Sequence, residues 1–340
     1  VLLFGFVINT DPKALPTAIV DYDRSDFSRS ISASLVNTRY FAIVPSPPSM
    51  EVADAMLARG DIQFAVVFPA GFSRQLVRGE RPSVLIAADA TDPSATGNAI
   101  AALTRLETTA LMHDLHGSLA KLDNGAPPFT LDIQRRYNPE GVTQYNIVPG
   151  LLAVILQLTM VMMTAFAITR ERERGTYEGL LATPVLPLEL MTGKIAPYVV
   201  VGIIQSALIL AAAKLLFAVP MLGSLSLLGA TMIVYIAALL GLGYAISTLA
   251  ANQLQAMQMT FFFFLPTMLL SGFMFPFRGM PLWAQWLGEI FPATHFLRIV
   301  RGILLKGNGA ADVLQHTWPI VLFMVCVGLL ARWRYRQTLD

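Results

Sequence analysis

The sequence predicts a polytopic α-helical membrane protein that carries an inserted α/β domain. Of its 340 residues, 55% are hydrophobic and 14% are charged, whereas soluble domains contain about 25% charged residues. Nearly all the long apolar runs lie after residue 146, while residues 9–146 show the polar periodicity and turn residues of a soluble domain. Before residue 147, Lys and Arg number 12 against 15 Asp and Glu; after it they number 12 against 7. The two parts are therefore expected to fold in different solvents.

Six membrane spans are expected, because a helix needs about 20 apolar residues to cross a bilayer. Residues 1–8 are apolar but too short to cross alone. We interpret them as the outer end of a first span, with a frayed apolar terminus as the alternative. The five spans after this first one are expected at about residues 147–169, 195–219, 225–250, 257–277 and 314–332. The last of them is short and requires Arg332 to snorkel to the interface.

Basic residues near the span ends predict the orientation. The 170–194 connection carries four of them and the tail after residue 331 carries three, which places both on the cytoplasmic side. Residues 9–146 and 278–317 then lie outside. Since the 278–317 segment also holds four basic residues, the parity of the spans decides the assignment. The sequence therefore predicts an extracytoplasmic domain over residues 9–146 and a transmembrane domain over residues 147–340.

Within the predicted outer domain, short β-branched or aromatic runs alternate with amphipathic helices. Ser25 and Ser49 are placed as N-caps of the first two helices, and Gly60 as a C-terminal stop. A longer helix is expected over residues 96–116. Strands are expected at residues 17–21, 41–44, 64–68 and 84–88. Such a segment is long enough to bury its own core, and its strand order is left open.

Several kinds of function are excluded by what the sequence lacks. A net charge of +2 is too small for a nucleic-acid partner, and the single cysteine rules out a disulfide framework. His113 and His116 are spaced i, i+3 but have no third ligand at zinc-site spacing, so we expect them to be solvated. The Gly193-Lys194 pair lacks the rest of a phosphate-binding loop. We therefore expect this chain to bind no metal or cofactor and to hydrolyse no ATP.

The connection over residues 170–194 reads RERERGTYEGLLATPVLPLELMTGK. Its alternating Arg and Glu predict a charged helical exit from the membrane, and a Gly-Thr pair can end that helix and cap another. Tyr177, Leu180 and Leu181 then share one apolar face. This pattern is typical of a short amphipathic helix at the cytoplasmic surface on which a partner can dock. An ordinary solvated connector is the alternative.

A second unusual stretch covers residues 280–306. Its apolar stripe, which includes two tryptophans, is broken by Pro292 and then resumes. The pattern predicts two short re-entrant helices that dip into the outer leaflet. Glu289 and Arg298 would then lie near the outer mouth, or pair at the interface.

These stretches resemble the permease subunit of type-2 ABC transporters. Residues 170–198 carry RERERGT-x-E-x-L-x-x-TP-x(8)-GK-x-x-PY, and residues 292–307 carry P-x-x-HF-x(4)-RG-x-x-L-x-G. The outer domain is similar to that of the export subfamily with a large extracytoplasmic insert, through DYD-x-S-x-x-SR over residues 21–29 and FP-x-GFS over residues 68–73. The resemblance covers almost the whole chain, and it departs from the family at the start and in the short last span.

The resemblance implies a subunit of a drug exporter in the cell inner membrane. Six spans in each of two permease subunits, identical or paralogous, would surround a pathway among the membrane lipids. A separate ATPase subunit would bind ATP and Mg, and a periplasmic adaptor protein is a possible further partner. The family's coupling segment maps here onto Glu173, Gly175, Thr176, Tyr177, Glu178, Leu180, Leu181 and Pro184. The outer gate maps onto Glu289, His295, Arg298 and Arg301.

Polar side chains inside the spans are candidates for the substrate path, because buried polar groups in lipid are costly. Each of them either lines the path or bridges two helices, and the sequence does not decide between these roles. The candidates are Gln157, Gln205, Ser206, Tyr235, Tyr244 and Ser247. The phenylalanines at 261–264 form an adaptable aromatic surface that suits hydrophobic cargo, with lipid-facing packing as the alternative.

Three other functions compete with drug export. A lipid or polysaccharide export permease has the same class of fold, although polysaccharide permeases usually lack a large outer domain. A membrane sensor with a ligand-binding outer domain is the alternative from a different class, but no kinase-like segment follows the spans. An intramembrane enzyme is disfavoured because no paired catalytic groups occur at a common depth.

Overall fold

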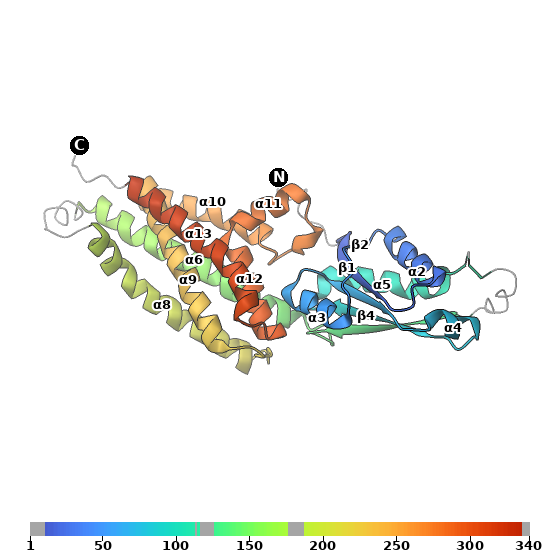
Figure 1. The fold of residues 1–340 in the computed structure, drawn as a ribbon. Helices are drawn as coiled ribbons and strands as arrows, with labels where there is room; N and C mark the ends of the chain where they lie inside the picture. Colours follow the sequence, from blue (N-terminus) through green and yellow to red (C-terminus); the bar gives the residue numbers. More distant parts are fainter. Residues whose placement is uncertain (1–10, 113, 116–125, 176–186, 335–340) are drawn as a thin grey trace. The chain divides into compact units, whose positions relative to one another are not determined.

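The computed structural model describes residues 11–112, 114–115, 126–175 and 187–334. The chain divides into two compact units (Figure 1). Among the described residues, the α/β unit comprises residues 11–146 together with Arg278–Met280, and the helical unit comprises residues 147–277 and 281–334. The predicted end of a first span at residues 1–8 lies outside the described residues.

The α/β unit is built on one mixed sheet with the strand order β2-β1-β3-β4-β5. Its strands are β1 (Leu15–Asp21), β2 (Phe41–Ile43), β3 (Phe64–Phe68), β4 (Ser83–Asp89) and β5 (Thr130–Arg136). The β1 strand is parallel to both β2 and β3, whereas β3 and β4 are antiparallel and β4 and β5 are parallel. The end of β5 therefore lies at the same edge of the sheet as the start of β1. The carboxyl ends of β1, β2 and β3 lie at the opposite edge.

Helices cover both faces of this sheet (Figure 1). On one face lie α2 (Asp26–Asn37), α4 (Phe72–Val77) and α5 (Pro93–Thr109); on the other lies α3 (Met50–Arg59). Alternation along β1 separates the two cores: Ile19 packs on the α2 side, and Val20 on the α3 side. Leu35 of α2 and Leu57 of α3 are almost fully buried against these faces.

Local patterns predicted most of this unit. The four predicted strands correspond to β1–β4, the Ser25 hydroxyl accepts a hydrogen bond from the Ser28 amide, and Gly60 ends α3 in the left-handed region. Ser49 occupies the N-cap of α3 but makes no capping hydrogen bond. The helix predicted over 96–116 is instead α5, which starts earlier because Asp92 caps it and ends at Thr109. Strand β5 was not predicted, because its largely polar, half-exposed residues lack the apolar run that marks the other strands.

The helical unit contains long apolar helices and a group of short ones (Figure 1). They are α6 (Thr143–Glu173), α8 (Pro187–Leu215), α9 (Leu225–Leu249), α10 (Gln253–Leu270), α11 (Leu282–Ile290), α12 (Pro292–Arg301) and α13 (Ala310–Arg334). Among the described residues, four segments are long and apolar enough to span a membrane. These are Thr143–Glu171, Ala196–Leu215, Leu225–Leu249 and Ala310–Ala331.

The predicted span at 257–277 differs most from the structure. Helix α10 starts at Gln253 and ends at Leu270, because Gly272 adopts a φ of 83° that ends the helix. The glutamines in its first turns lower its hydropathy, so α10 is not one of the four apolar spans. Helix α13 begins at Ala310, which gives the short last run the length that it lacked in the predicted range of 314–332.

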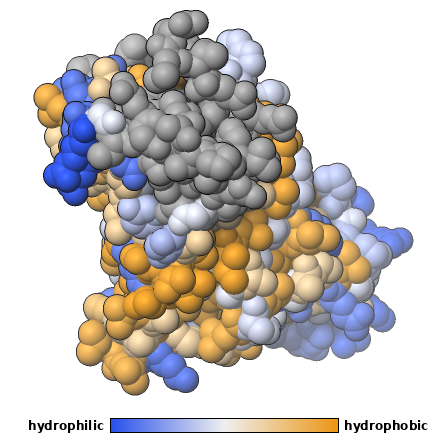
Figure 2. Space-filling model, turned by 90° about the vertical axis from the view of Figure 1, so that its left-hand side faces the viewer, coloured by the Kyte–Doolittle hydropathy of each residue, from blue (hydrophilic) through white to orange (hydrophobic). Residues whose placement is uncertain are grey.

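Helix α9 lies at the centre of the helical unit and packs against α8, α10, α12 and α13. It also crosses α6 closely, since a Cβ atom on Gly243 would lie 2.6 Å from the Val161 carbonyl oxygen. The Tyr235 ring stacks on Phe296 of α12, with ring centroids 4.1 Å apart. Helices α8 and α13 instead expose most of their apolar side chains. Figure 2 shows hydrophobic residues over much of the face that it views, which is a surface suited to lipid or to other membrane helices.

Candidate functional site

An apolar groove runs along α10, and we call it the aromatic groove. Its volume is about 540 Å³. Leu242 and Ile246 line it from α9, and Phe291 closes it at the junction of α11 and α12. The α10 side of the groove is formed by Gln258, Met259, Phe262, Phe263 and Pro266. The amide of Gln258 is its one polar side chain, so the groove can accept a largely apolar molecule that carries a single hydrogen-bonding group.

Two of the candidate path residues bridge helices. The Tyr235 hydroxyl donates to the Ala153 carbonyl oxygen of α6 at 3.1 Å, and the ring is fully buried. The Thr159 hydroxyl of α6 donates to Gln205 Oε1 of α8 at 2.9 Å. Both contacts tie α6 to a neighbouring helix.

The two serines among the candidates turn onto their own helices. Ser206 donates to the Gly202 carbonyl oxygen at 2.6 Å, and Ser247 donates to the Tyr244 carbonyl oxygen at 2.6 Å. Both serines are fully buried, and Tyr244 is nearly so. None of these three side chains lines the aromatic groove.

Gln157 is the exception among the candidates. Its side chain is 2% exposed within α6, and its Nε2 has no hydrogen-bond partner among the described residues. An unsatisfied buried amide costs free energy, and such groups concentrate where structures rearrange or meet a ligand. Gln157 therefore remains the strongest of the predicted path residues.

Three of the four residues predicted for the outer gate contact one another. Glu289 of α11 receives two hydrogen bonds from Arg298 of α12, at 2.7 and 3.0 Å, in the paired geometry that guanidinium and carboxylate groups favour. His295 is 6% exposed, and its Nε2 lies 2.9 Å from the Glu289 carbonyl oxygen. Arg298 also lies over the Phe277 ring, 4.6 Å from its centroid. These contacts hold α11 and α12 together as one paired element.

Arg301, the fourth predicted gate residue, points elsewhere. Its Nη1 donates to the Gly272 carbonyl oxygen at 3.1 Å, in the segment that follows α10. Arg301 thereby ties α12 to the end of α10, whereas Arg298 ties α12 to α11. The predicted cluster of four is therefore two separate contacts.

Only the edges of the predicted coupling segment can be described. Glu173 ends α6, and its carboxylate accepts hydrogen bonds from the backbone amide of Gln253, at 2.7 Å, and from the Gln253 side chain. Hydrogen bonds from Gln253 hold the pKa of Glu173 below its usual value, so Glu173 is ionised at neutral pH. Gly175 has a φ of 68° and ends the described part of the segment. The other predicted contacts, Thr176, Tyr177, Glu178, Leu180, Leu181 and Pro184, lie outside the described residues.

Several residues of this region were not predicted from the sequence. Gln253 meets Glu173 across 80 positions of sequence, and no local pattern marks such a pair. His316 of α13 lies with its ring centroid 6.1 Å from that of His295. The Thr294 hydroxyl, fully buried, donates to the Gly288 carbonyl oxygen at 2.6 Å. The position of Thr294 could have indicated such a contact, because Ser and Thr hydroxyls near helix ends often bond to nearby backbone groups.

His113 and His116 lie outside the described residues. Within the described part of the chain, no group of three His, Cys, Asp or Glu side chains is placed to hold a metal ion.

Long apolar helices packed around a central one are typical of a multi-pass membrane protein. The chain belongs to the ABC-2 family of transporter proteins, since the family model described as "ABC-2 family transporter protein" matches residues 1–333.

Curated relatives support this assignment over nearly the whole chain. The chain is 29% identical to the "Probable multidrug ABC transporter permease YbhR" of Escherichia coli, over 99% of this chain and 90% of the relative. It is 30% identical to the "Probable multidrug ABC transporter permease YbhS", over 97% of this chain and 84% of the relative. It is also 30% identical to the "Inner membrane transport permease YhhJ", over 95% and 86% respectively. The resemblance drawn from the sequence motifs is thereby confirmed.

Proposed function

We propose that this chain is the membrane permease subunit of an ATP-driven exporter of drugs or other amphipathic compounds. The aromatic groove is the observation that carries this proposal: it offers an apolar surface with one amide, Gln258. Such a lining favours cargo with a large apolar body and one polar group. The names of the relatives, two of which are probable multidrug permeases, support the same substrate class.

The proposal includes the partners and the topology. A separate ABC ATPase subunit binds ATP and Mg and docks on the connection at residues 170–194, with no cofactor held by this chain. A second permease subunit, identical or paralogous, completes the pathway in the cell inner membrane. The α/β unit lies on the extracytoplasmic side, where a periplasmic adaptor protein is a possible further partner. The basic residues of the 170–194 connection and the family membership support this arrangement.

Efflux of a fluorescent dye tests the role of the groove. The chain is co-expressed with its ATPase subunit in cells that lack their own dye exporters, and ethidium efflux is measured. Phe262→Ala removes the most exposed aromatic ring of the groove, and we expect it to lower efflux several-fold at unchanged membrane abundance. Ile204→Ala is the matched control, because Ile204 is exposed on α8 away from the groove.

Gln258→Leu separates cargo classes in the same assay. This variant removes the one polar group of the groove, so efflux of a dye with a hydrogen-bonding group should fall more than efflux of an apolar dye. Wild-type efflux by both groove variants would contradict a role for the groove. Movement of a fluorescent phospholipid, with no dye efflux by the wild type, would instead support lipid export.

The docking of the ATPase on the connection is tested separately. An apolar anchor at an interface centre costs about 2 kcal/mol or more when it is removed, whereas charges at the rim cost much less. Leu181→Asp should therefore abolish co-purification of the ATPase and dye efflux, while Glu178→Gln should change them little. Unchanged co-purification with Leu181→Asp would contradict this contact.

A further inference from the structure

A crevice in the α/β unit lies where the chain connections reverse direction. The connection from β1 to α2 passes to one face of the sheet, and the connection from the neighbouring β2 to α3 passes to the other face. Loops that leave adjacent strand ends toward opposite faces separate from each other and leave a gap between them. In open α/β sheets, ligands bind in this gap, outside the carboxyl ends of the strands.

The gap is a real cavity, which we call the switch-point cavity. Its volume is about 510 Å³. Its floor is the end of β1, and its walls are the two loops that topology separates. Asp21, Tyr22 and Arg24 line it from the first loop, and Ser46, Pro47 and Pro48 line it from the second. The volume suits a small organic molecule.

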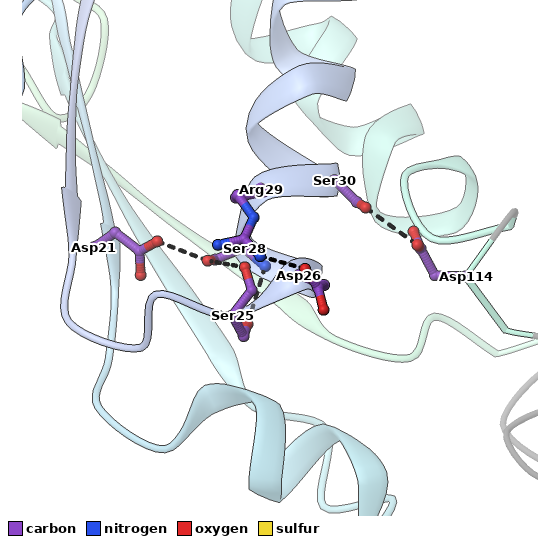
Figure 3. A network of polar contacts seen from close by, with 7 residues as sticks. All are labelled: Asp21, Ser25, Asp26, Ser28, Arg29, Ser30 and Asp114. Atoms are coloured by element: carbon purple, nitrogen blue, oxygen red, sulfur yellow. Dashed lines mark hydrogen bonds and ion pairs between the residues drawn. The ribbon is translucent and has the colours of Figure 1, made fainter.

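The first loop is held in place by Asp21. One carboxylate oxygen, Oδ1, accepts the backbone amides of Asp23 and Arg24 at 3.0 and 2.8 Å, and Oδ2 accepts the Ser28 hydroxyl at 2.6 Å. Figure 3 shows the contact between Asp21 and Ser28 beside the N-cap contact of Ser25. Asp23 is likewise occupied, because it accepts both the amide and the hydroxyl of Ser73 at 3.1 Å. The hydrogen-bonding capacity of both acidic side chains is thus directed into the protein, and the loop is fixed before any ligand arrives.

Arg24 is the one cation on the lining. Its backbone has a φ of 52°, in the left-handed region that a non-glycine residue adopts at some cost. Its side chain is exposed and makes no ion pair or hydrogen bond with any described residue. Arg29, only five positions later, is paired with Asp26 instead (Figure 3). The guanidinium of Arg24 is therefore available to a ligand.

Besides its polar groups, the lining contains three ring side chains, those of Tyr22, Pro47 and Pro48. The Tyr22 side chain is 48% exposed, and its hydroxyl accepts the Met50 amide at 3.3 Å, which fixes the ring between the two loops. Pro47 and Pro48 offer ring surfaces and no backbone donor. An anionic group that pairs with a guanidinium, attached to a ring that packs on Tyr22 and Pro48, matches this combination.

We propose that the switch-point cavity binds a small organic anion with an apolar ring, its carboxylate or phosphate on Arg24 and its ring against Tyr22 and Pro48. The site lies wholly within the α/β unit. It does not depend on the proposed export function, and the two fail in separate experiments.

The test measures binding of phenyl phosphate to the purified full chain in detergent micelles by isothermal titration calorimetry. We expect saturable binding with one site per chain, and a Kd at least tenfold higher for Arg24→Gln. Ser46→Trp, which fills the cavity from the second loop, should also abolish binding without removing the charge. Arg29→Gln is the matched control, since it removes a nearby cation outside the cavity, and its Kd should equal that of the wild type.

Other ligands and a second cavity sharpen the test. Inorganic phosphate and benzyl alcohol should each bind at least tenfold more weakly than phenyl phosphate, because each supplies only half of the contacts.

A second cavity of the same unit, between α2 and α5, carries Arg105. Arg105→Gln should leave the Kd unchanged. The proposal is overturned by an absence of saturable binding, by equal binding of inorganic phosphate, or by loss of binding in Arg105→Gln but not in Arg24→Gln. Hydrogen exchange of the α/β unit verifies that each variant is folded.

Discussion

The two units use the same polar side chains in different ways. In the α/β unit, many hydroxyls and carboxylates bind backbone amides at the ends of elements, as Ser25 does for α2 and Asp92 for α5, and only a few hydroxyls, such as that of Ser32, donate to a carbonyl oxygen four residues earlier. In the helical unit, hydroxyls within the long helices mostly donate to a carbonyl oxygen four residues earlier in the same helix. Among the described residues, eight hydroxyls do so: those of Thr159, Thr164, Thr169, Ser206, Thr231, Thr260, Thr267 and Thr317.

This difference follows from the hydrogen-bonding capacity of the solvent around each unit. Water can satisfy a polar group at the surface of the α/β unit, so its side chains are free to fix loops and helix ends. Lipid offers no such partner, so a hydroxyl on a membrane helix is satisfied within its own turn. Contacts between helices are then left to close backbone approach, as at Gly243, and to rare bridges such as that of Tyr235.

The substitution with the largest expected effect tests the close crossing of α6 and α9 in the helical unit. Gly243→Leu should strongly disrupt the crossing of α6 and α9, because its Cβ would meet the Val161 carbonyl oxygen at 2.6 Å. Overpacking of this kind costs about 1–3 kcal/mol or more. Gly241→Leu is the control, since a Cβ there meets nothing within 4 Å. The measurement is the fraction of monodisperse protein after heating in detergent, and equal loss in both variants would contradict the close crossing.

The next largest effect is expected from a substitution that tests whether Asp21 holds the loop between β1 and α2. Asp21→Ala removes an acceptor of three hydrogen bonds and should destabilise this unit by about 2 kcal/mol or more. Peptide-resolved hydrogen exchange should then show faster exchange in α2 and β1, with α9 unchanged. Asp26→Ala is the control, because its exposed pair with Arg29 contributes little. Equal protection in the two variants would show that Asp21 does not hold the loop.

A paired substitution compares the two units directly. Ser25→Ala removes a helix cap and should cost about 1 kcal/mol. Ser206→Ala removes only a hydroxyl that returns to its own helix, and it should change stability by less than about 0.5 kcal/mol. Hydrogen exchange of α2 and of α8 measures each effect in its own unit. A larger loss from Ser206→Ala would reveal a partner across helices and support its role on the substrate path.

The smallest effect concerns pH in the α/β unit. Burial, with the charges of Asp89 and Asp54, raises the pKa of Tyr137 to about 12. Because the folded pKa lies above the usual value of about 10, the associated stability is fully present below pH 10. It is lost as the pH rises toward 12. The difference in phenolate absorbance between wild type and Tyr137→Phe should therefore titrate near pH 12, and titration near pH 10 would contradict burial of this ring.

Local sequence patterns predicted the positions of the strands and helices in the α/β unit, but they did not predict how the strands pair. Short β-branched or aromatic runs predicted the places of β1–β4, and Gly60 marked the end of α3. The antiparallel pairing of β3 with β4 and the edge strand β5 were not predictable, because pairing depends on partners distant in sequence. In the helical unit, apolar length predicted the spans but misplaced α10, whose end depends on the left-handed Gly272.

The candidate site was predictable as a set of residue types but not as a geometry. The sequence placed Glu289 and Arg298 near the outer mouth, with pairing at the interface as the alternative, and in the structure the two side chains pair. Arg301 was expected with them but reaches Gly272 instead. Both arginines lie on α12, so which one meets α11 depends on how α12 is rotated, and spacing along the chain does not specify that rotation.

The sequence by itself determined that this is a membrane protein with two parts adapted to different solvents, and its motifs determined the ABC-2 family. Those properties are encoded locally, in the length and period of apolar runs and in short patterns of charge, Gly and Pro. Only the tertiary structure decided that Glu173 meets Gln253 and that Tyr235 bridges to α6. It also decided that the loops after β1 and β2 enclose a cavity around Arg24. Such contacts depend on the crossing of helices and the order of strands, which arise when distant segments compete to bury the same apolar surface.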